Sequence, residues 1–204
     1  MRENRRLSSK VSGFLAEPLG LGGREKLFQH KFLTNNMKRG LVILIIFFSL
    51  IFALFLIRLI SPRELDDISP EIPCPELEIY KPDILYIISY FDNKPISENK
   101  IWCEKINSLN KKAEIHGISH QPYQEFLVKN ISQEDLDFAM LEFEKCFNQT
   151  PDKFKPPQLK ISKENKILIE ENNLKLENYF NQITHKVYHC NDEGKIKNKW
   201  IKIF

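Results

Sequence analysis

The sequence has no strong excess of charge of either sign, and this absence bears on its partners. Its 30 basic and 27 acidic side chains leave a formal net charge of +3 over 204 residues. Proteins that bind nucleic acids gain much of their affinity from basic side chains that neutralise phosphates. The composition therefore gives no case for a nucleic-acid partner.

Closely spaced cysteines are also missing. No Cys-x-x-Cys pair occurs in the chain, and this spacing is typical of structural zinc clusters. The cysteines are even in number, and all of them follow a long apolar segment. If that segment crosses a membrane, they lie in a compartment that permits disulfides, and the alternative is free buried thiols. Three pairings are open to the four residues, which are Cys74, Cys103, Cys146 and Cys190.

One long segment has no charge at all. Residues 40–57 carry no ionisable side chain, and the apolar character continues for two residues beyond Arg58. About 20 apolar residues at about 1.5 Å rise each are enough to cross a bilayer. The run exceeds the apolar core of a signal peptide, and no small-residue cleavage site follows at residues 61–63. We predict a transmembrane anchor over residues 37–61, with lipid contact through residues 40–60.

The residues before this anchor set its expected orientation. Residues 1–39, which come before the uncharged run, include nine basic and three acidic side chains, and the positive-inside rule then places the N-terminus in the cytoplasm. The prediction is a single-pass protein of the cell membrane with an extracytoplasmic domain. Residues 1–36 show no sustained hydrophobic period and are predicted to be a disordered basic tail. Met37 before two basic residues resembles a start site, so the alternative is a gene-model extension.

Residues 62–204 are long enough for one compact domain. Their apolar run at residues 83–91 is typical of a strand buried on both faces, as in parallel sheets. Further strands or extended segments are predicted at residues 113–115, 154–159 and 183–190, alternating with helices over residues 97–109 and after Ser132 and Ser162. This alternation predicts an α/β domain with mostly parallel strands and a site at their carboxyl edge.

Histidines and a paired acid supply the candidate chemistry. Four of the five histidines form two pairs with the same spacing, near predicted strand ends, and Asp66-Asp67 lies upstream. One carboxylate and two imidazoles provide three ligands for an ion such as zinc, which leaves a coordination position for water and substrate. The pairs are His116 with His120 and His185 with His189. The alternative is an exposed acidic turn and histidines that bind nothing, in a small structural membrane protein.

The order of these features resembles the polysaccharide deacetylase (NodB-homology) superfamily, in particular a divergent, membrane-anchored branch of unknown function. In that family an Asp-Asp pair closes the first strand, a His-x-x-x-His element follows the third, a proline segment lines the groove and a late histidine completes the site. The matching positions are Asp66-Asp67, His116 to His120, Lys155-Pro156-Pro157, and either His185 or His189. The usual family domain is longer, so the resemblance implies a reduced or incomplete (β/α) barrel.

The resemblance also implies a role for each residue. Asp67, His116 and His120 would hold a divalent metal, with Zn²⁺ expected. Asp66 would act as general base, and His189, slightly favoured over His185, as general acid. Lys155, Pro156, Pro157 and Tyr123 would line the substrate groove. Three positions depart from the family: Gly117 replaces Ser or Thr, Lys155 replaces Arg, and Gln158 replaces an aromatic residue.

Two functions follow from this resemblance. The first is a membrane-anchored, metal-dependent hydrolase that removes N-acetyl groups from an extracellular glycan or related amide. The alternative is a catalytically impaired carbohydrate- or metal-binding module on the cell surface. In such a module aromatic side chains would stack on sugar rings. The candidates are Tyr90, Phe91, Trp102 and Tyr123, although Trp102 is better explained as a core residue.

Overall fold

The computed structural model describes residues 22–120 and 125–191. The chain divides into two compact units, residues 1–49 and 50–204.

Helix α1 (Gly22–Ile60) begins earlier than the sequence analysis predicted. Residues 22–36 are helical, in place of part of the predicted disordered tail, and no proline occurs from residue 19 to residue 61 to interrupt the helix. The first 21 residues of that predicted tail lie outside the described residues.

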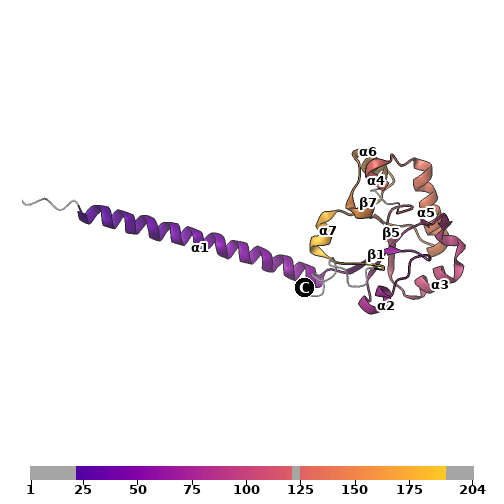
Figure 1. The fold of residues 1–204 in the computed structure, drawn as a ribbon, viewed down its shortest axis with the longest axis horizontal. Helices are drawn as coiled ribbons and strands as arrows, with labels where there is room; N and C mark the ends of the chain where they lie inside the picture. The colour runs from indigo at the N-terminus through magenta and orange to yellow at the C-terminus, as the bar shows by residue number, and fades with distance from the viewer. Residues whose placement is uncertain (1–21, 121–124, 192–204) are drawn as a thin grey trace, which may run out of the picture. The chain divides into compact units, whose positions relative to one another are not determined.

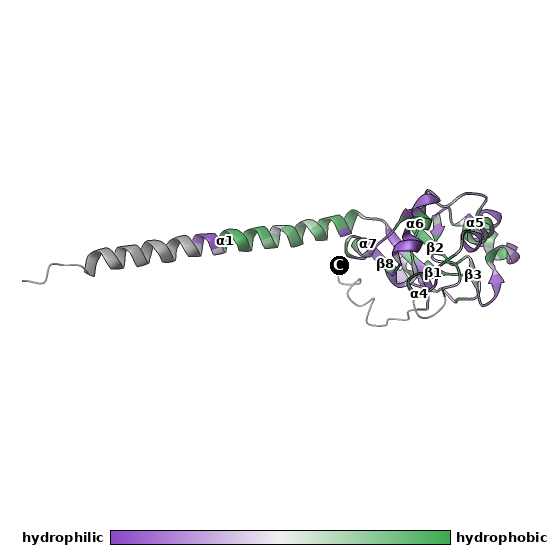
Figure 2. Ribbon diagram, turned by 90° about the horizontal axis from the view of Figure 1, so that it is seen from above, coloured by the Kyte–Doolittle hydropathy of each residue, from purple (hydrophilic) through white to green (hydrophobic). Residues whose placement is uncertain are grey.

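The apolar part of α1 runs from Lys38 to Ile60 and has a mean hydropathy of 3.2 in its most apolar window. It is the one helix in the described part of the chain that is long and apolar enough to cross a membrane. Its side chains are mostly exposed rather than packed in a protein core, and Figure 2 shows the continuous apolar character. These properties are compatible with a single-pass anchor.

In the described residues, six strands form one parallel sheet in the order β7-β6-β5-β2-β1-β8. Strands β7, β5 and β1 of this sheet are labelled in Figure 1. Strands β7 and β8 form its two edges, whereas a closed barrel of this class has about eight strands. The predicted α/β fold with mostly parallel strands is confirmed, and the sheet that the described residues form is open. The strands are β1 (Arg63–Ile68), β2 (Ile84–Ile87), β5 (Lys112–Ile115), β6 (Lys153–Phe154), β7 (Lys175–Leu176) and β8 (Lys186–His189), with a separate antiparallel pair, β3 (Tyr90–Phe91) and β4 (Lys94–Pro95).

Short helices connect the strands, and side-chain caps fix where several of them start. Ser132 and Asp135 form a capping box at the start of α5, and the Ser162 side chain accepts from the backbone N–H of Asn165. Both predicted helix starts are therefore confirmed. The helices are α2 (Glu76–Tyr80), η1 (Ile96–Glu98), α3 (Lys100–Ser108), α4 (Glu125–Val128), α5 (Gln133–Phe147), η2 (Pro157–Leu159), α6 (Lys163–Glu171) and α7 (Tyr179–Thr184).

The last predicted strand was wrong over its first residues. Residues up to Thr184 belong to helix α7, whose start is capped by the Asn178 side chain accepting from the N–H of Phe180. Strand β8 begins only at Lys186. The predicted strand at residues 83–91 is likewise divided, because β2 ends at Ile87 and the β3 hairpin follows.

Two disulfides close the domain, and they resolve the pairing that the sequence left open. Cys74, before α2, bonds to Cys190, directly after β8. Cys103 in α3 bonds to Cys146 in α5. The described residues hold no free cysteine.

Candidate metal centre

The end of strand β1 is irregular where the acidic pair lies. The register between β1 and β2 shifts between Leu65 and Ile68, and Asp67 has a φ of 63°. In a regular strand Asp66 and Asp67 would point to opposite faces. A bulge re-aims a side chain, and left-handed backbone at a non-glycine residue is uncommon and concentrates at functional sites. The backbone of β1 therefore sets where the Asp67 carboxylate points.

The loop after β5 positions both histidines. His116 follows β5 directly, and its backbone N–H donates to the carbonyl of Ile87 at 2.7 Å. The buried Glu125 carboxylate accepts from the backbone N–H groups of Ser119 and His120 at 3.1 and 3.2 Å, and from the Ser119 hydroxyl. Glu125 thus fixes the loop. The sequence did not point to Glu125, because a lone glutamate after a loop carries no signal of its burial.

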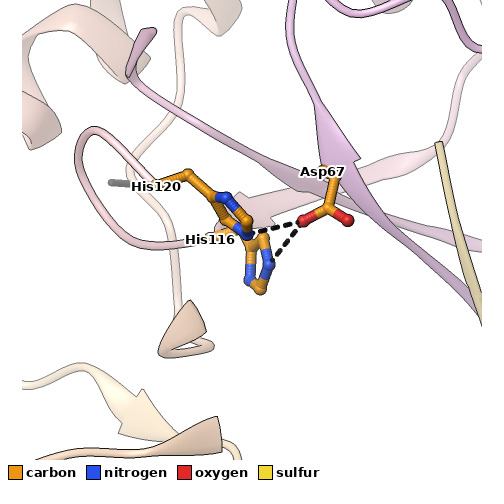
Figure 3. A group of neighbouring side chains, drawn as sticks. All are labelled: Asp67, His116 and His120. Carbon is orange, nitrogen blue, oxygen red and sulfur yellow. Dashed lines mark hydrogen bonds and ion pairs between the residues drawn. The ribbon is translucent and has the colours of Figure 1, made fainter. Parts of the chain in front are cut away.

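Asp67, His116 and His120 come together at the carboxyl edge of the sheet (Figure 3). Oδ1 of Asp67 lies 3.0 Å from Nε2 of His116 and 2.8 Å from Nε2 of His120. One ligand atom from each residue lies within 4.8 Å of the other two. The structure therefore groups the three side chains that the sequence analysis proposed as metal ligands.

The hydrogen bonds of His116 show that a cation fits this group. Nδ1 of His116 lies 3.0 Å from the Lys155 carbonyl oxygen, which can only accept, so Nδ1 carries the hydrogen. In a neutral imidazole, Nε2 then points a lone pair at Oδ1 of Asp67. Two acceptors facing each other need a positive charge between them, supplied by a proton or by a metal. A carbonyl that orients a ligating imidazole in this way is typical of metal sites.

The same contacts shift two pKa values. Burial raises the pKa of the Asp67 carboxyl, but hydrogen bonds and charge from His116 and His120 outweigh it, so this pKa lies far below its ordinary value. Burial lowers the pKa of His120, but the Asp67 carboxylate outweighs it and the net pKa is raised. Asp67 is therefore held as a carboxylate, which is the form that binds a metal.

Asp66 belongs to a different, buried group of charges. Nζ of Lys155 lies 2.8 Å from Oδ1 of Asp66 and 2.8 Å from Oε2 of Glu64. All three residues are at most 1% exposed, and the Lys155 ammonium also lies 4.5 Å from the ring centre of Tyr86. Burial lowers the pKa of Lys155, but the two carboxylates raise it further, so the lysine stays charged. Lys155 thus holds Asp66 in place.

The late histidines occupy different positions. Nε2 of His189 lies 3.6 Å from Oδ2 of Asp66, the oxygen that Lys155 does not contact. His185 ends α7 with Nε2 4.0 Å from Glu64, and burial lowers its pKa. His189 is therefore the histidine beside the predicted base. The backbone N–H of Asn191, two residues further on, donates to the Glu76 carboxylate at 3.2 Å.

Three of the four predicted groove residues lie in the interior of the domain rather than on its surface. Lys155, Pro156 and Pro157 are all buried, so their side chains do not form an open wall. Tyr123 lies outside the described residues. Of the aromatic residues proposed to stack on sugars, Trp102 packs edge-on against Phe147, as a core residue does.

Position 117 requires a glycine, because of its backbone conformation and its contacts. Its φ is +67°, and a Cβ there would lie 2.6 Å from Cγ of Pro157. We expect Gly117→Ala to lower the free energy of unfolding by about 1–3 kcal/mol, because strain and overpacking add. Near-ultraviolet circular dichroism during thermal melting of the full chain in detergent measures this loss. The control is Gly40→Ala, whose Cβ meets nothing within 4 Å; equal melting of both variants contradicts the expectation.

The pKa shifts predict how the metal-free protein responds to pH. The depressed pKa of Asp67 stabilises the fold above the unfolded carboxyl value, about 3.9, and this contribution disappears as pH falls. The raised pKa of His120 stabilises the fold below about 6.5, and this contribution disappears as pH rises through the folded value. Urea unfolding with chelator present should therefore show stability falling above about pH 6.5. His120→Asn should flatten that fall; an unchanged slope contradicts the assignment.

The fold and the site define an α/β domain with an Asp-His-His candidate metal centre. No family model and no curated protein matches the sequence. Among solved structures, the wild-type CE4 family pseudoenzyme from Bacillus anthracis matches with a TM-score of 0.43 and 14% identity, over 56% of this chain and 41% of that chain. A mutant of this pseudoenzyme with restored enzymatic activity gives 0.39 and 16%, over 49% and 35%. The chain spans less than half the length of these neighbours.

Proposed function

We propose that this chain is a membrane-anchored, metal-dependent hydrolase that removes N-acetyl groups from an extracellular glycan or a related amide. The proposal rests on one observation. Asp67, His116 and His120 bring three ligand atoms within 4.8 Å of one another, and a second carboxylate, that of Asp66, lies on the same strand as Asp67. Three protein ligands leave room for water and substrate. The resemblance to polysaccharide deacetylases, seen in the order of these residues, points to the N-acetyl group.

The residues of the chain divide the chemistry between them. Asp67, His116 and His120 would hold a zinc-like ion, which would supply Lewis-acid chemistry for polarising an amide carbonyl and making water more acidic. Asp66 accepts the proton of the attacking water at Oδ2, while Lys155 holds its other oxygen. His189, 3.6 Å from Oδ2, donates a proton to the departing amine. His185 contacts Glu64 and lies outside this pair.

The proposed location places the domain outside the cytoplasm. Both disulfides belong to the domain that follows the apolar helix, and disulfides persist in oxidising compartments. The basic residues before the apolar part of α1 favour a cytoplasmic N-terminus. Both observations support an extracytoplasmic site that meets its substrate at the cell surface.

A second function has one observation in its favour. Asp66 is 1% exposed and bound to Lys155, whereas a general base must reach the water that it activates. If Asp66 stays buried with substrate bound, the chain is a metal- or carbohydrate-binding module. Turnover separates the two functions, because only the hydrolase releases acetate.

We expect Asp66→Asn to lower acetate release by about 100-fold or more, because general base catalysis contributes on that order. The assay uses the full chain in detergent, loaded with zinc, and an N-acetylated chitooligosaccharide. The control is Asp92→Asn, which changes an exposed aspartate in the β3–β4 turn. Activity that survives Asp66→Asn removes this residue as base. A wild-type chain that holds metal and sugar yet releases no acetate supports the binding module.

A further inference from the structure

Helix α7 has two chemically different faces. Its inner face carries Asn181, which donates to Oε1 of Glu64 at 2.8 Å, and Thr184, which is 4% exposed. Its outer face carries Tyr179, Phe180 and Ile183, which are 55%, 62% and 53% exposed. At about 100° per residue these three side chains share one side of the helix. We call them the α7 apolar face.

The C-terminal end of α7 lies next to the end of the apolar helix. Nη1 of Arg58, in the last turn of α1, donates to the carbonyl oxygens of Gln182 and Ile183 at 2.9 and 3.0 Å. An arginine that binds the last carbonyls of a helix also caps it. Arg58 and α7 belong to the same compact unit, residues 50–204. The contact therefore fixes α7 beside the residues where the predicted membrane span ends.

We propose that the α7 apolar face inserts into the interfacial layer of the bilayer, so that the domain touches the membrane at a second point. The inference rests on the proposed membrane anchor. Arginine, tyrosine and other aromatic side chains at the end of a span favour this layer, where a ring meets lipid and polar atoms meet water. An apolar face in that layer is bound by the hydrophobic effect, as interfacial helices are.

Such a contact has a consequence for the candidate metal centre. Strand β1 begins at Arg63, three residues after α1 ends, and Asp67 lies towards its other end. A strand rises about 3.3 Å per residue, so Asp67 lies roughly 13 Å along β1 from Arg63. Two points of attachment, α1 and α7, then fix how that edge of the sheet faces an extracellular substrate.

The test measures whether lipid reaches the α7 apolar face in the full-length chain. Phe180→Trp is reconstituted in phosphatidylcholine nanodiscs, with acyl chains either brominated or not. Bromine quenches tryptophan emission by contact, and the signal is compared with that of the wild-type chain, which contains Trp102 and Trp200. The matched control is Ile101→Trp, at an apolar residue of α3 that is 82% exposed. Extraction of the same preparations with alkaline carbonate tests the anchor independently.

We expect brominated lipid to remove most of the emission that Phe180→Trp adds, and little of that added by Ile101→Trp. A chain that resists carbonate extraction while Phe180→Trp shows no quenching overturns the proposal and leaves the anchor standing. A chain that carbonate extracts overturns the anchor and the proposal together. Emission that responds to an N-acetylated oligosaccharide but not to brominated lipid also overturns it, because the face is then a sugar platform.

Discussion

Full-length chain purified without an affinity tag should contain about one zinc-like ion per molecule, and His116→Ala/His120→Ala should contain none. The double variant removes two of the three ligand atoms that lie within 4.8 Å of one another. Asp67 alone then remains, and a single carboxylate binds zinc weakly compared with an Asp-His-His set. Elemental analysis of both proteins measures the difference directly.

The control for this measurement is His185→Ala. It removes a histidine of similar exposure to His120, but one that lies 4.0 Å from Glu64 and outside the ligand group. The control should keep its metal. Absence of metal from the wild type, even after reconstitution at neutral pH, contradicts the metal centre and with it the hydrolase.

Metal binding should also raise the free energy of unfolding. A ligand present at about 100 times its dissociation constant stabilises the folded state by about 2.7 kcal/mol. Zinc should therefore raise the melting temperature of the wild type and of His185→Ala, and leave His116→Ala/His120→Ala unchanged. The tautomer of His116 explains why zinc should stabilise the wild type, because the Nε2 lone pair of this residue already faces Asp67.

Local patterns in the sequence were enough to predict the elements that depend on neighbouring residues. Ser132 and Ser162 start helices through hydrogen bonds to residues three positions later, so the signal is contained in four residues. The grouping of the proposed ligands was also predictable, because strand ends of a parallel sheet meet at one edge. His116 follows β5 directly and Asp67 lies near the end of β1, as that rule requires.

Features that depend on distant residues were not predictable in the same way. The bulge at Asp67 arises from the pairing of β1 with β2. The burial of Glu125 depends on the loop that it binds, and the disulfides join residues 116 and 43 positions apart. Lys155 was expected in the groove, yet it lies between carboxylates of β1, 89 and 91 positions away. Sequence spacing carries no information about such contacts.

Lys155→Met should be the most destabilising single substitution considered for this chain. It removes the cation that contacts both Glu64 and Asp66, all of which are at most 1% exposed. Breaking a buried ion pair costs about 3–5 kcal/mol, because the remaining charge has lost its partner. The control is Lys166→Met, which breaks an exposed pair with Glu170 and should cost at most about 1 kcal/mol. Urea unfolding of both variants in detergent measures the two losses.

The dependence of this loss on pH identifies its cause. Burial raises the pKa of Glu64, and Lys155 opposes that rise, so removing the lysine should raise the pKa further. A carboxyl whose folded pKa exceeds its unfolded value of about 4.3 destabilises the fold increasingly as pH rises above that value. The loss of unfolding free energy caused by Lys155→Met should therefore be larger at pH 8 than at pH 5, and adding Glu64→Gln should reduce this loss. An equal loss of unfolding free energy at pH 5 and pH 8 would instead indicate lost packing of the lysine side chain, because packing does not respond to protonation.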